Sequence, residues 1–277
     1  MTTWKTTPTK TIDVDGTSFA YRELGTPGGV PVVFLHHLTA VLDDWDPRVL
    51  DGVAAQHHVI AFDNRGVGST GGRVPTDVAQ MGADAIAFIR ALGYEQVDLL
   101  GFSLGGGVAQ VITLEHPELV RRLILAGTGP AGGGGIEKIN RIAASAYTKA
   151  ALTLRDPRHY LFFNRNPVGK RAATDYMARL KERTSDRDKR ISLQARRAQL
   201  KAIRAAGLQA PHDLGKITQP VFIANGDNDV MVASSLSADL ARSIPNSKLT
   251  IYPDSGHGGI FQFHEDFVQR ALEFLRS

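Results

Sequence analysis

A serine between two glycines is the first feature of the sequence that could do chemistry. The stretch Gly101-Phe-Ser103-Leu-Gly105 has the G-x-S-x-G spacing, which is typical of a serine on a sharp turn between a strand and a helix. Side chains at the two glycine positions would collide in such a turn. The helix that follows directs its free N–H groups and positive dipole end at the serine, where negative charge can be stabilised. The spacing therefore predicts that Ser103 is a nucleophile.

A serine hydroxyl is a weak nucleophile and needs an adjacent base. When the serine stands on such a turn, an acid and then a histidine follow it along the chain. His257 comes just after the apolar segment 249–252, at the same predicted edge of a sheet as Ser103. His257 is therefore predicted to be the base. The acids that could orient it are Asp229, which follows the apolar segment 220–224, and the alternatives Asp227 and Asp254.

Attack on a carbonyl group also needs N–H donors for the oxyanion. One donor is expected to be the backbone N–H of Leu104, and the second should lie in the loop after the apolar segment 31–35. Leu38 is the candidate in that loop. His36 and His37 precede it, but adjacent side chains of an extended segment point apart, so the two histidines are not expected to chelate one metal ion.

The elements that must position these residues follow an alternating pattern. Strands separated by helices form a parallel sheet covered on both faces, so the sequence predicts an α/β fold with a mostly parallel, twisted sheet. Two alternating segments around Asp15-Gly16 predict an antiparallel hairpin, and residues 1–9 predict a loose tail. Strands are expected within 31–35, 59–62, 97–102, 123–126, 220–224 and 249–252, and helices within 76–92, 104–115, 234–243 and 265–276.

A helical insertion at residues 130–215 interrupts this pattern, and 1–129 together with 216–277 form the predicted core domain. The segment 141–216 carries 18 Lys and Arg against 6 Asp and Glu, although the whole chain has a net charge of only +4. Such an excess can attract an anionic substrate, but solvated helix faces are the plainer explanation.

Composition excludes several classes of protein. The chain has no cysteine, which excludes disulfides, thiolate metal sites and cysteine nucleophiles. No apolar run approaches the length of a membrane span, and the first residues lack a signal-peptide pattern. The basic segment carries no nucleic-acid-binding motif. We therefore expect a soluble, cytoplasmic protein without membrane or nucleic-acid partners; its oligomeric state does not follow from the sequence.

Four motifs together resemble the α/β-hydrolase superfamily, in its branch of lidded bacterial esterases and haloperoxidases. In that family the acid usually stands three residues after a glycine, which selects Asp229 over Asp227 because Gly226 precedes it. The family usually has glycine where this chain has His37, so this side chain could narrow the oxyanion hole or contact the substrate. The motifs are GFSLGG at 101–106, FDNRGVGST at 62–70, GDND at 226–229 and GHGG at 256–259.

The resemblance implies hydrolysis of a carboxylic ester or lactone through an acyl-enzyme on Ser103, on a small-molecule substrate and without cofactor or metal. The insertion would form a lid over the site. Relatives that are haloalkane dehalogenases or epoxide hydrolases carry aspartate at the nucleophile position, so Ser103 argues against both. The same triad serves C–C bond hydrolases, thioesterases, perhydrolases and cofactor-free oxygenases, and a non-catalytic ligand-binding protein of this fold is a further alternative.

Six residues are candidates for the substrate pocket. Phe102 and Val230 neighbour Ser103 and Asp229 in the sequence, and His37 is the departure from the family pattern. The insertion adds three aromatic residues, which are more often the core of a lid than substrate contacts. The six are His37, Phe102, Tyr160, Phe162, Phe163 and Val230.

Overall fold

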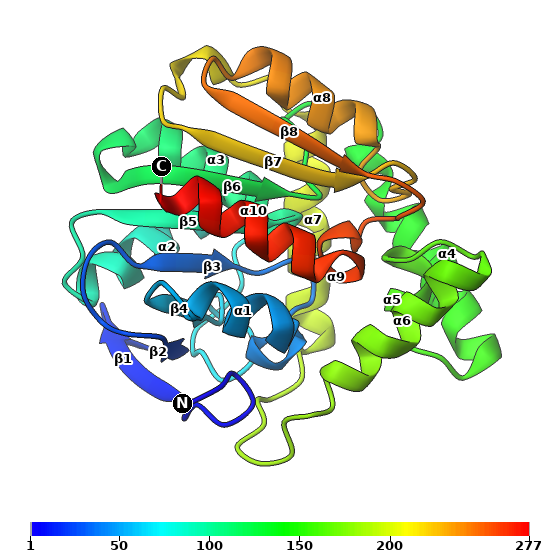
Figure 1. Ribbon diagram of the computed structural model, residues 1–277, viewed down its shortest axis with the longest axis horizontal. Coiled ribbons are helices and arrows are strands. Elements are labelled where there is room, and N and C mark those ends of the chain that lie inside the picture. The colour runs from blue at the N-terminus through cyan, green and yellow to red at the C-terminus, as the bar shows by residue number, and fades with distance from the viewer. Residues whose placement is uncertain (1, 277) are drawn as a thin grey trace.

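The centre of the molecule is a twisted eight-stranded sheet (Figure 1). The computed structural model describes residues 2–276. Strand order is β1-β2-β4-β3-β5-β6-β7-β8; β2 is antiparallel to both β1 and β4, and all other neighbours are parallel. This confirms the predicted α/β class. The strands are β1 (Lys10–Val14), β2 (Thr17–Leu24), β3 (Val32–Leu35), β4 (Val59–Phe62), β5 (Val97–Phe102), β6 (Val120–Ala126), β7 (Val221–Gly226) and β8 (Ser247–Tyr252).

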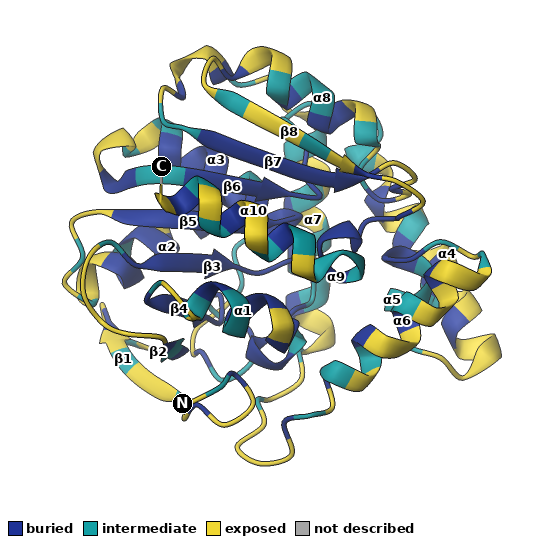
Figure 2. Cartoon of the chain, viewed as in Figure 1, coloured by how far each residue is buried: buried dark blue, intermediate teal, exposed yellow. Residues whose placement is uncertain are grey.

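Helices cover both faces of the sheet, and each face has its own apolar cluster. On one face α1 and α10 pack against each other and the strands, whereas α2, α3 and α8 cover the other face. The central strands β3, β4, β5 and β7 are buried along their whole length, which is why they read as continuous apolar runs (Figure 2). These helices are α1 (Pro47–Ala54), α2 (Val78–Ala91), α3 (Leu104–Glu115), α8 (Ser234–Ser243) and α10 (His264–Arg276), preceded by the short α9 (Gly259–Gln262).

Helix boundaries follow local capping. The carboxylate of Asp77 accepts the N–H of Ala79, so α2 begins at Val78 rather than at residue 76. The short helix α1 was not predicted. Its start is set by Asp46, whose side chain accepts the N–H of Arg48, and by Pro47 in the first turn.

The prediction of a loose tail at residues 1–9 is wrong for residues 2–9; residue 1 lies outside the described part. Trp4 is only 2% exposed, and its N–H donates to the carboxylate of Asp51 at 2.6 Å. The guanidinium of Arg183 donates to the carbonyls of Trp4 and Thr7 at 3.1 and 2.9 Å. These partners are 47 to 179 residues away along the chain, so local composition could not reveal them.

Between β6 and β7 the chain forms four α-helices, and no strand is assigned to residues 130–215. Figure 1 shows α4, α5 and α6 beyond the edge at which the parallel strands end, whereas α7 lies against the sheet layer. Ala202 of α7 is fully buried in the cluster that contains α2 and α3, and Tyr176 of α6 is fully buried in the other cluster. The insertion therefore packs into both cores. Its helices are α4 (Ile139–Thr153), α5 (Arg158–Leu161), α6 (Pro167–Arg179) and α7 (Leu193–Leu208).

Candidate active site

Ser103 stands on the sharp turn that the glycine spacing predicts. It joins β5 to α3 with φ of 56° and ψ of −114°, a strained conformation for a residue with a side chain. A Cβ at Gly101 would overlap the carbonyl oxygen of Gly105, and a Cβ at Gly105 would overlap that of Leu35. The N–H of Ser103 donates to the carbonyl of Ala126 at 2.8 Å. The two glycines and this bond hold Ser103 in its strained conformation.

His257 and Asp229 form a buried hydrogen-bonded pair. Nδ1 of His257 lies 2.7 Å from Oδ2 of Asp229, and both side chains are shielded from solvent. The other carboxylate oxygen accepts the N–H groups of Met231 and Val232 at 2.7 and 3.0 Å. An ionised carboxylate only accepts hydrogen bonds, so Nδ1 carries the proton and Nε2 is left as the basic nitrogen. Nε2 is buried and has no hydrogen-bond partner within residues 2–276.

The two alternative acids have other roles. The carboxylate of Asp227 accepts the N–H of Asp254 at 3.0 Å and so shapes the loop before His257. The carboxylate of Asp254 accepts the side-chain amide of Asn166 in the insertion at 2.6 Å. Of the three candidate acids, Asp229 is the one that contacts the histidine.

Ser103 and His257 line the same cavity, which has a volume of about 800 Å³. The imidazole of His257 is held between aromatic rings, with centroids 4.9 Å from Phe102 and 5.4 Å from Phe162. A Cβ at Gly127 would lie 3.2 Å from this imidazole, so a glycine there leaves room for the ring. Within residues 2–276, Ser103 and His257 form no direct hydrogen bond. In hydrolytic sites this contact often tightens when the substrate binds.

Leu38 and Leu104, the two candidates for the oxyanion hole, lie near Ser103: Leu38 lines the large cavity with Ser103, and Leu104 follows Ser103 in the chain. Both residues are buried, and neither N–H donates a hydrogen bond within residues 2–276. The loop after β3 turns sharply at Thr39, where φ is 67°. The N–H of Thr39 donates to the side chain of Gln199 in α7 at 2.8 Å. The insertion thus helps to hold the loop that carries the Leu38 N–H.

His37 occupies the position where a glycine was expected from the family pattern. Its ring is nearly perpendicular to Phe102 and Phe162, with centroids 5.3 and 5.1 Å away. Burial lowers the pKa of His37 to about 3, so the imidazole is neutral and Nδ1–H donates to the carbonyl of Leu38 at 2.9 Å. Burial likewise lowers the pKa of the neighbouring His36 to about 4. Within residues 2–276 no group of three metal-ligating side chains includes either histidine.

The six candidate pocket residues do not all lie at one cavity. His37 and Phe162 line the large cavity with Ser103, whereas Phe102 is fully buried beneath them. Phe163 is also buried and packs on the ring of Tyr176. Tyr160 and Val230 line a separate outer cavity. The expectation that Phe102, Tyr160, Phe163 and Val230 line the pocket is therefore wrong. Of the three aromatic residues predicted from the insertion, only Phe162 lines the cavity with Ser103.

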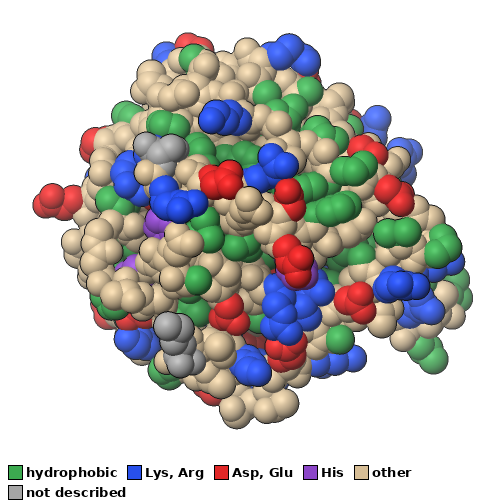
Figure 3. Space-filling view, viewed as in Figure 1, with side chains coloured by type: hydrophobic (Ala, Val, Ile, Leu, Met, Phe, Trp, Pro, Cys, Tyr) green, Lys and Arg blue, Asp and Glu red, His purple; other side chains and the backbone are tan. Residues whose placement is uncertain are grey.

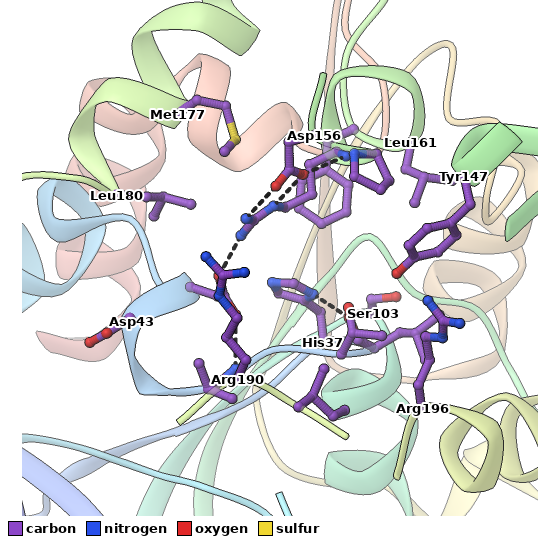
Figure 4. A pocket seen from close by; sticks show the side chains of 18 of the residues that line it. His37, Asp43, Ser103, Tyr147, Asp156, Leu161, Met177, Leu180, Arg190 and Arg196 are labelled. Carbon is purple, nitrogen blue, oxygen red and sulfur yellow. Dashed lines mark hydrogen bonds and ion pairs between the residues drawn. The ribbon is translucent and has the colours of Figure 1, made fainter. Parts of the chain in front are cut away.

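Charged side chains, none of them predicted as site residues from the sequence, line much of the large cavity. Most of these side chains come from the insertion, and the excess of Lys and Arg in 141–216 was the signal that pointed to them. Figure 4 shows several of them around Ser103 and His37. They are Asp156, Arg158, Lys181, Arg187, Asp188, Arg190 and Arg196, together with Asp43 and Asp44 from the core.

Part of the positive charge of the insertion is neutralised by the core. Arg179 of α6 forms an ion pair with the buried Asp46 at 2.6 Å, and Arg48 of α1 pairs with Glu182 at 2.6 Å. In the space-filling view, basic and acidic side chains lie together where α1 approaches the insertion (Figure 3). Ion pairs with the core and solvation therefore account for part of the excess of Lys and Arg in the insertion. This agrees in part with the expectation of solvated helix faces.

Comparisons with a family model and with known proteins all point to the α/β-hydrolase fold. Residues 30–263 match the family model described as alpha/beta hydrolase fold. A solved alpha/beta hydrolase fold protein from Chitinophaga pinensis is 37% identical, with 100% of both chains covered and a TM-score of 0.96. A non-heme haloperoxidase from Rhodococcus erythropolis is 28% identical over 95% of this chain and 97% of its own. The enol-lactonase from Burkholderia xenovorans LB400, 18% identical over 97% of this chain and 100% of its own, has a TM-score of 0.76 and shows the shared fold alone.

Proposed function

Because this chain belongs to the α/β-hydrolase fold family, we propose that it is a serine hydrolase that cleaves a carboxylic ester or a lactone through an acyl-enzyme on Ser103. The observation that carries the proposal is the buried 2.7 Å contact between His257 and Asp229, on the same cavity as the strained Ser103.

In the proposed acylation step, the Ser103 hydroxyl attacks the carbonyl carbon while Nε2 of His257 takes its proton. Asp229 orients the imidazole and stabilises the cation that forms. The N–H groups of Leu38 and Leu104 bind the oxyanion, and each such donor typically contributes about 10²- to 10³-fold in rate. The bond to the leaving oxygen then breaks, and His257 donates the proton to that oxygen.

In the proposed deacylation step, water replaces the leaving group. His257 takes a proton from the water as its oxygen attacks the acyl carbon, and the proton returns to Ser103 Oγ when the ester bond to the enzyme breaks. These steps use side chains and backbone groups of the chain itself and need no cofactor.

The insertion 130–215 is, in this proposal, a cap on the core formed by 1–129 and 216–277. It supplies Phe162 and most of the charged lining of the cavity, and its Gln199 holds the loop that carries Leu38. Such a cap would exclude water and select a small-molecule substrate. Within the described residues no helix has the length and apolar character needed to cross a membrane. The cytoplasmic location expected from the sequence stays a prediction.

Perhydrolysis is the second candidate, because a relative of similar length is named a non-heme haloperoxidase. The same acyl-enzyme would then be attacked by hydrogen peroxide instead of water, giving a peracid. Thioester and C–C bond hydrolysis would use the same residues. A panel of esters, lactones, thioesters and β-diketones, each tested with and without peroxide, separates these reactions.

Labelling with a fluorophosphonate probe tests the proposal, with the labelled peptide identified by mass spectrometry. The expected result is a single adduct on Ser103, absent from Ser103→Ala. Ser192→Ala is the matched control, because Ser192 lines the same cavity but is not proposed to react. The absence of an adduct on folded wild-type protein would contradict an activated serine and would favour a ligand-binding role.

A further inference from the structure

Two cavities meet at Ser103, and they differ in their relation to the proposed base. The large cavity of about 800 Å³ is lined by His257. A smaller cavity of about 120 Å³ also reaches Ser103 but is not lined by His257. A base that must protonate the leaving oxygen has to lie on the leaving-group side of the scissile bond. The leaving alcohol therefore belongs in the large cavity, and the acyl chain belongs in the small one.

The small cavity suits a short, uncharged acyl group. No Lys or Arg lines it, and Glu115 is the one carboxylate in its lining, so a negatively charged acyl group would be repelled. Its volume is close to the roughly 150 Å³ of an engineered apolar cavity that binds benzene. Most of its walls are apolar side chains, among them Val78, Val111, Ile136, Ile139, Ile203 and Val232.

The large cavity contains cations of two kinds. Arg158 is paired with Asp44, and it donates to Asp156 at 2.8 Å. Burial alone would lower the pKa of Arg158, but the two neighbouring carboxylates have the larger effect and raise this pKa well above its usual value. Arg187 is paired with the buried Asp43 at 3.1 Å. These two arginines are thus already engaged by the protein.

Lys181, Arg190 and Arg196 also line the cavity, and within residues 2–276 none of them forms an ion pair with a carboxylate. The guanidinium of Arg196 lies over the ring of Tyr147, 4.6 Å from its centroid, which positions a cation while leaving its N–H donors free. Figure 4 shows Arg190 and Arg196 on opposite sides of the view, with Ser103 and His37 between them.

Within residues 2–276, none of the carboxylates that line this cavity lies within ion-pair distance of Lys181, Arg190 or Arg196. Asp43 and Asp44 are held by arginines, as is Asp156. Asp188 accepts the hydroxyl of Ser69 at 2.7 Å. The leaving-group side of the site therefore presents unpaired guanidinium groups, whereas the acyl side presents none.

From this asymmetry we propose that the substrate is an ester of a short apolar acyl group with an alcohol that bears a carboxylate, and that one of the two free guanidinium groups, that of Arg190 or that of Arg196, binds this carboxylate. A guanidinium group matches a carboxylate with two parallel hydrogen bonds. The inference rests on the proposed acyl-enzyme. Ser103 Oγ bonds to the acyl carbon as the C–O bond to the alcohol breaks, and the Ser103 proton passes through His257 to the alcohol oxygen. Water then releases the short acid.

Matched substrates test the orientation of the charge. The pair 4-carboxyphenyl butanoate and 4-carbamoylphenyl butanoate differs in charge but little in shape, and monophenyl succinate carries its carboxylate on the acyl side. Hydrogen bonds to charged groups contribute enough to change a rate by about 10- to 100-fold. We expect kcat/KM of the carboxyphenyl ester to exceed that of the carbamoyl ester by at least about tenfold, with the succinate the poorest of the three.

Matched variants test the two arginines. One of the two variants Arg190→Gln and Arg196→Gln should lower kcat/KM for the carboxyphenyl ester by about 10-fold or more and leave the carbamoyl ester within about threefold, whereas the other should behave like the controls. The controls are Lys189→Gln and Arg197→Gln, which remove the same charge from exposed neighbours outside the cavity. Calorimetry on Ser103→Ala provides a readout independent of turnover: 4-hydroxybenzoate should bind more tightly than 4-hydroxybenzamide.

The outcomes separate the two proposals. Equal rates for the charged and neutral esters would overturn the carboxylate site, as would equal losses of kcat/KM in the cavity variants and their controls. If turnover still depends on Ser103 in that case, the proposed serine hydrolase activity remains supported. If no ester is cleaved in a Ser103-dependent manner, the proposed function fails and the substrate class fails with it.

Discussion

Replacing Asp229 by Asn tests the link between the acid and the base. In the native site Oδ2 accepts Nδ1–H of His257 at 2.7 Å, while Oδ1 accepts the N–H groups of Met231 and Val232. An asparagine must place its carbonyl oxygen toward the two backbone donors. Its NH₂ group then faces His257 and donates to Nδ1, so the imidazole proton moves to Nε2. Nε2 can then no longer accept the serine proton.

The expected loss is large because it removes the base rather than a single contact. The corresponding change in a Ser-His-Asp triad lowers kcat by about 10⁴-fold, equivalent to roughly 5 kcal/mol of transition-state stabilisation at 1.36 kcal/mol per tenfold. We expect a similar fall in kcat on a butanoate ester, with KM changed by less than about threefold because the substrate contacts stay in place.

The assay compares initial rates of wild type, Asp229→Asn and the control Asp227→Asn. Asp227 lies two positions away and is exposed, and it accepts backbone N–H groups of the loop before His257 rather than the histidine itself. The control should retain at least about a tenth of wild-type kcat, since a surface hydrogen bond contributes about 1 kcal/mol. Retention of more than a tenth of the activity in Asp229→Asn, or an equal loss in Asp227→Asn, would refute the reasoning.

Two further predictions concern stability. Burial lowers the pKa of His36 to about 4 and that of His37 to about 3, so below the unfolded value near 6.5 the unfolded chain binds protons that the folded chain rejects. Stability should therefore fall as the pH drops from 6.5, by about 2 kcal/mol per histidine at pH 5; urea midpoints that do not change between pH 7 and 5 would contradict this. Trp4→Ala should lower the free energy of unfolding by about 3 kcal/mol. The control Lys5→Ala, at an exposed position, should lower it by less than about 0.5 kcal/mol. Equal urea midpoints for the two variants would mean that the N-terminal segment contributes nothing to stability.

Local signals explain why much of the fold could be predicted. The helices at 104–115 and 234–243 have the predicted boundaries, because the apolar periodicity of each is bounded by turn or strand signals on both sides. The central strands are buried on both faces and so appear as apolar runs. Ser103 and His257 could be placed at one edge because each follows a strand of a parallel sheet.

The remaining features depend on contacts between distant segments. Trp4 docks on Asp51 and Arg183 through hydrogen bonds that no local pattern encodes. The loop path that brings Arg190 to the cavity follows no helical period, so the sequence indicated a basic segment but not which of its side chains face Ser103. The orientation of Tyr160 away from the cavity is set by the short helix α5 and by a 2.6 Å contact of its hydroxyl with that of Thr153.

The most direct test of the central claim is to trap the acyl-enzyme itself. Wild-type protein is mixed with a butanoate ester, quenched in acid within the steady state, and digested for peptide mass spectrometry. We expect a butanoyl group on Ser103 that is absent from Ser103→Ala. Turnover without an adduct on Ser103, or with a butanoyl group on another residue, would contradict Ser103 as the nucleophile.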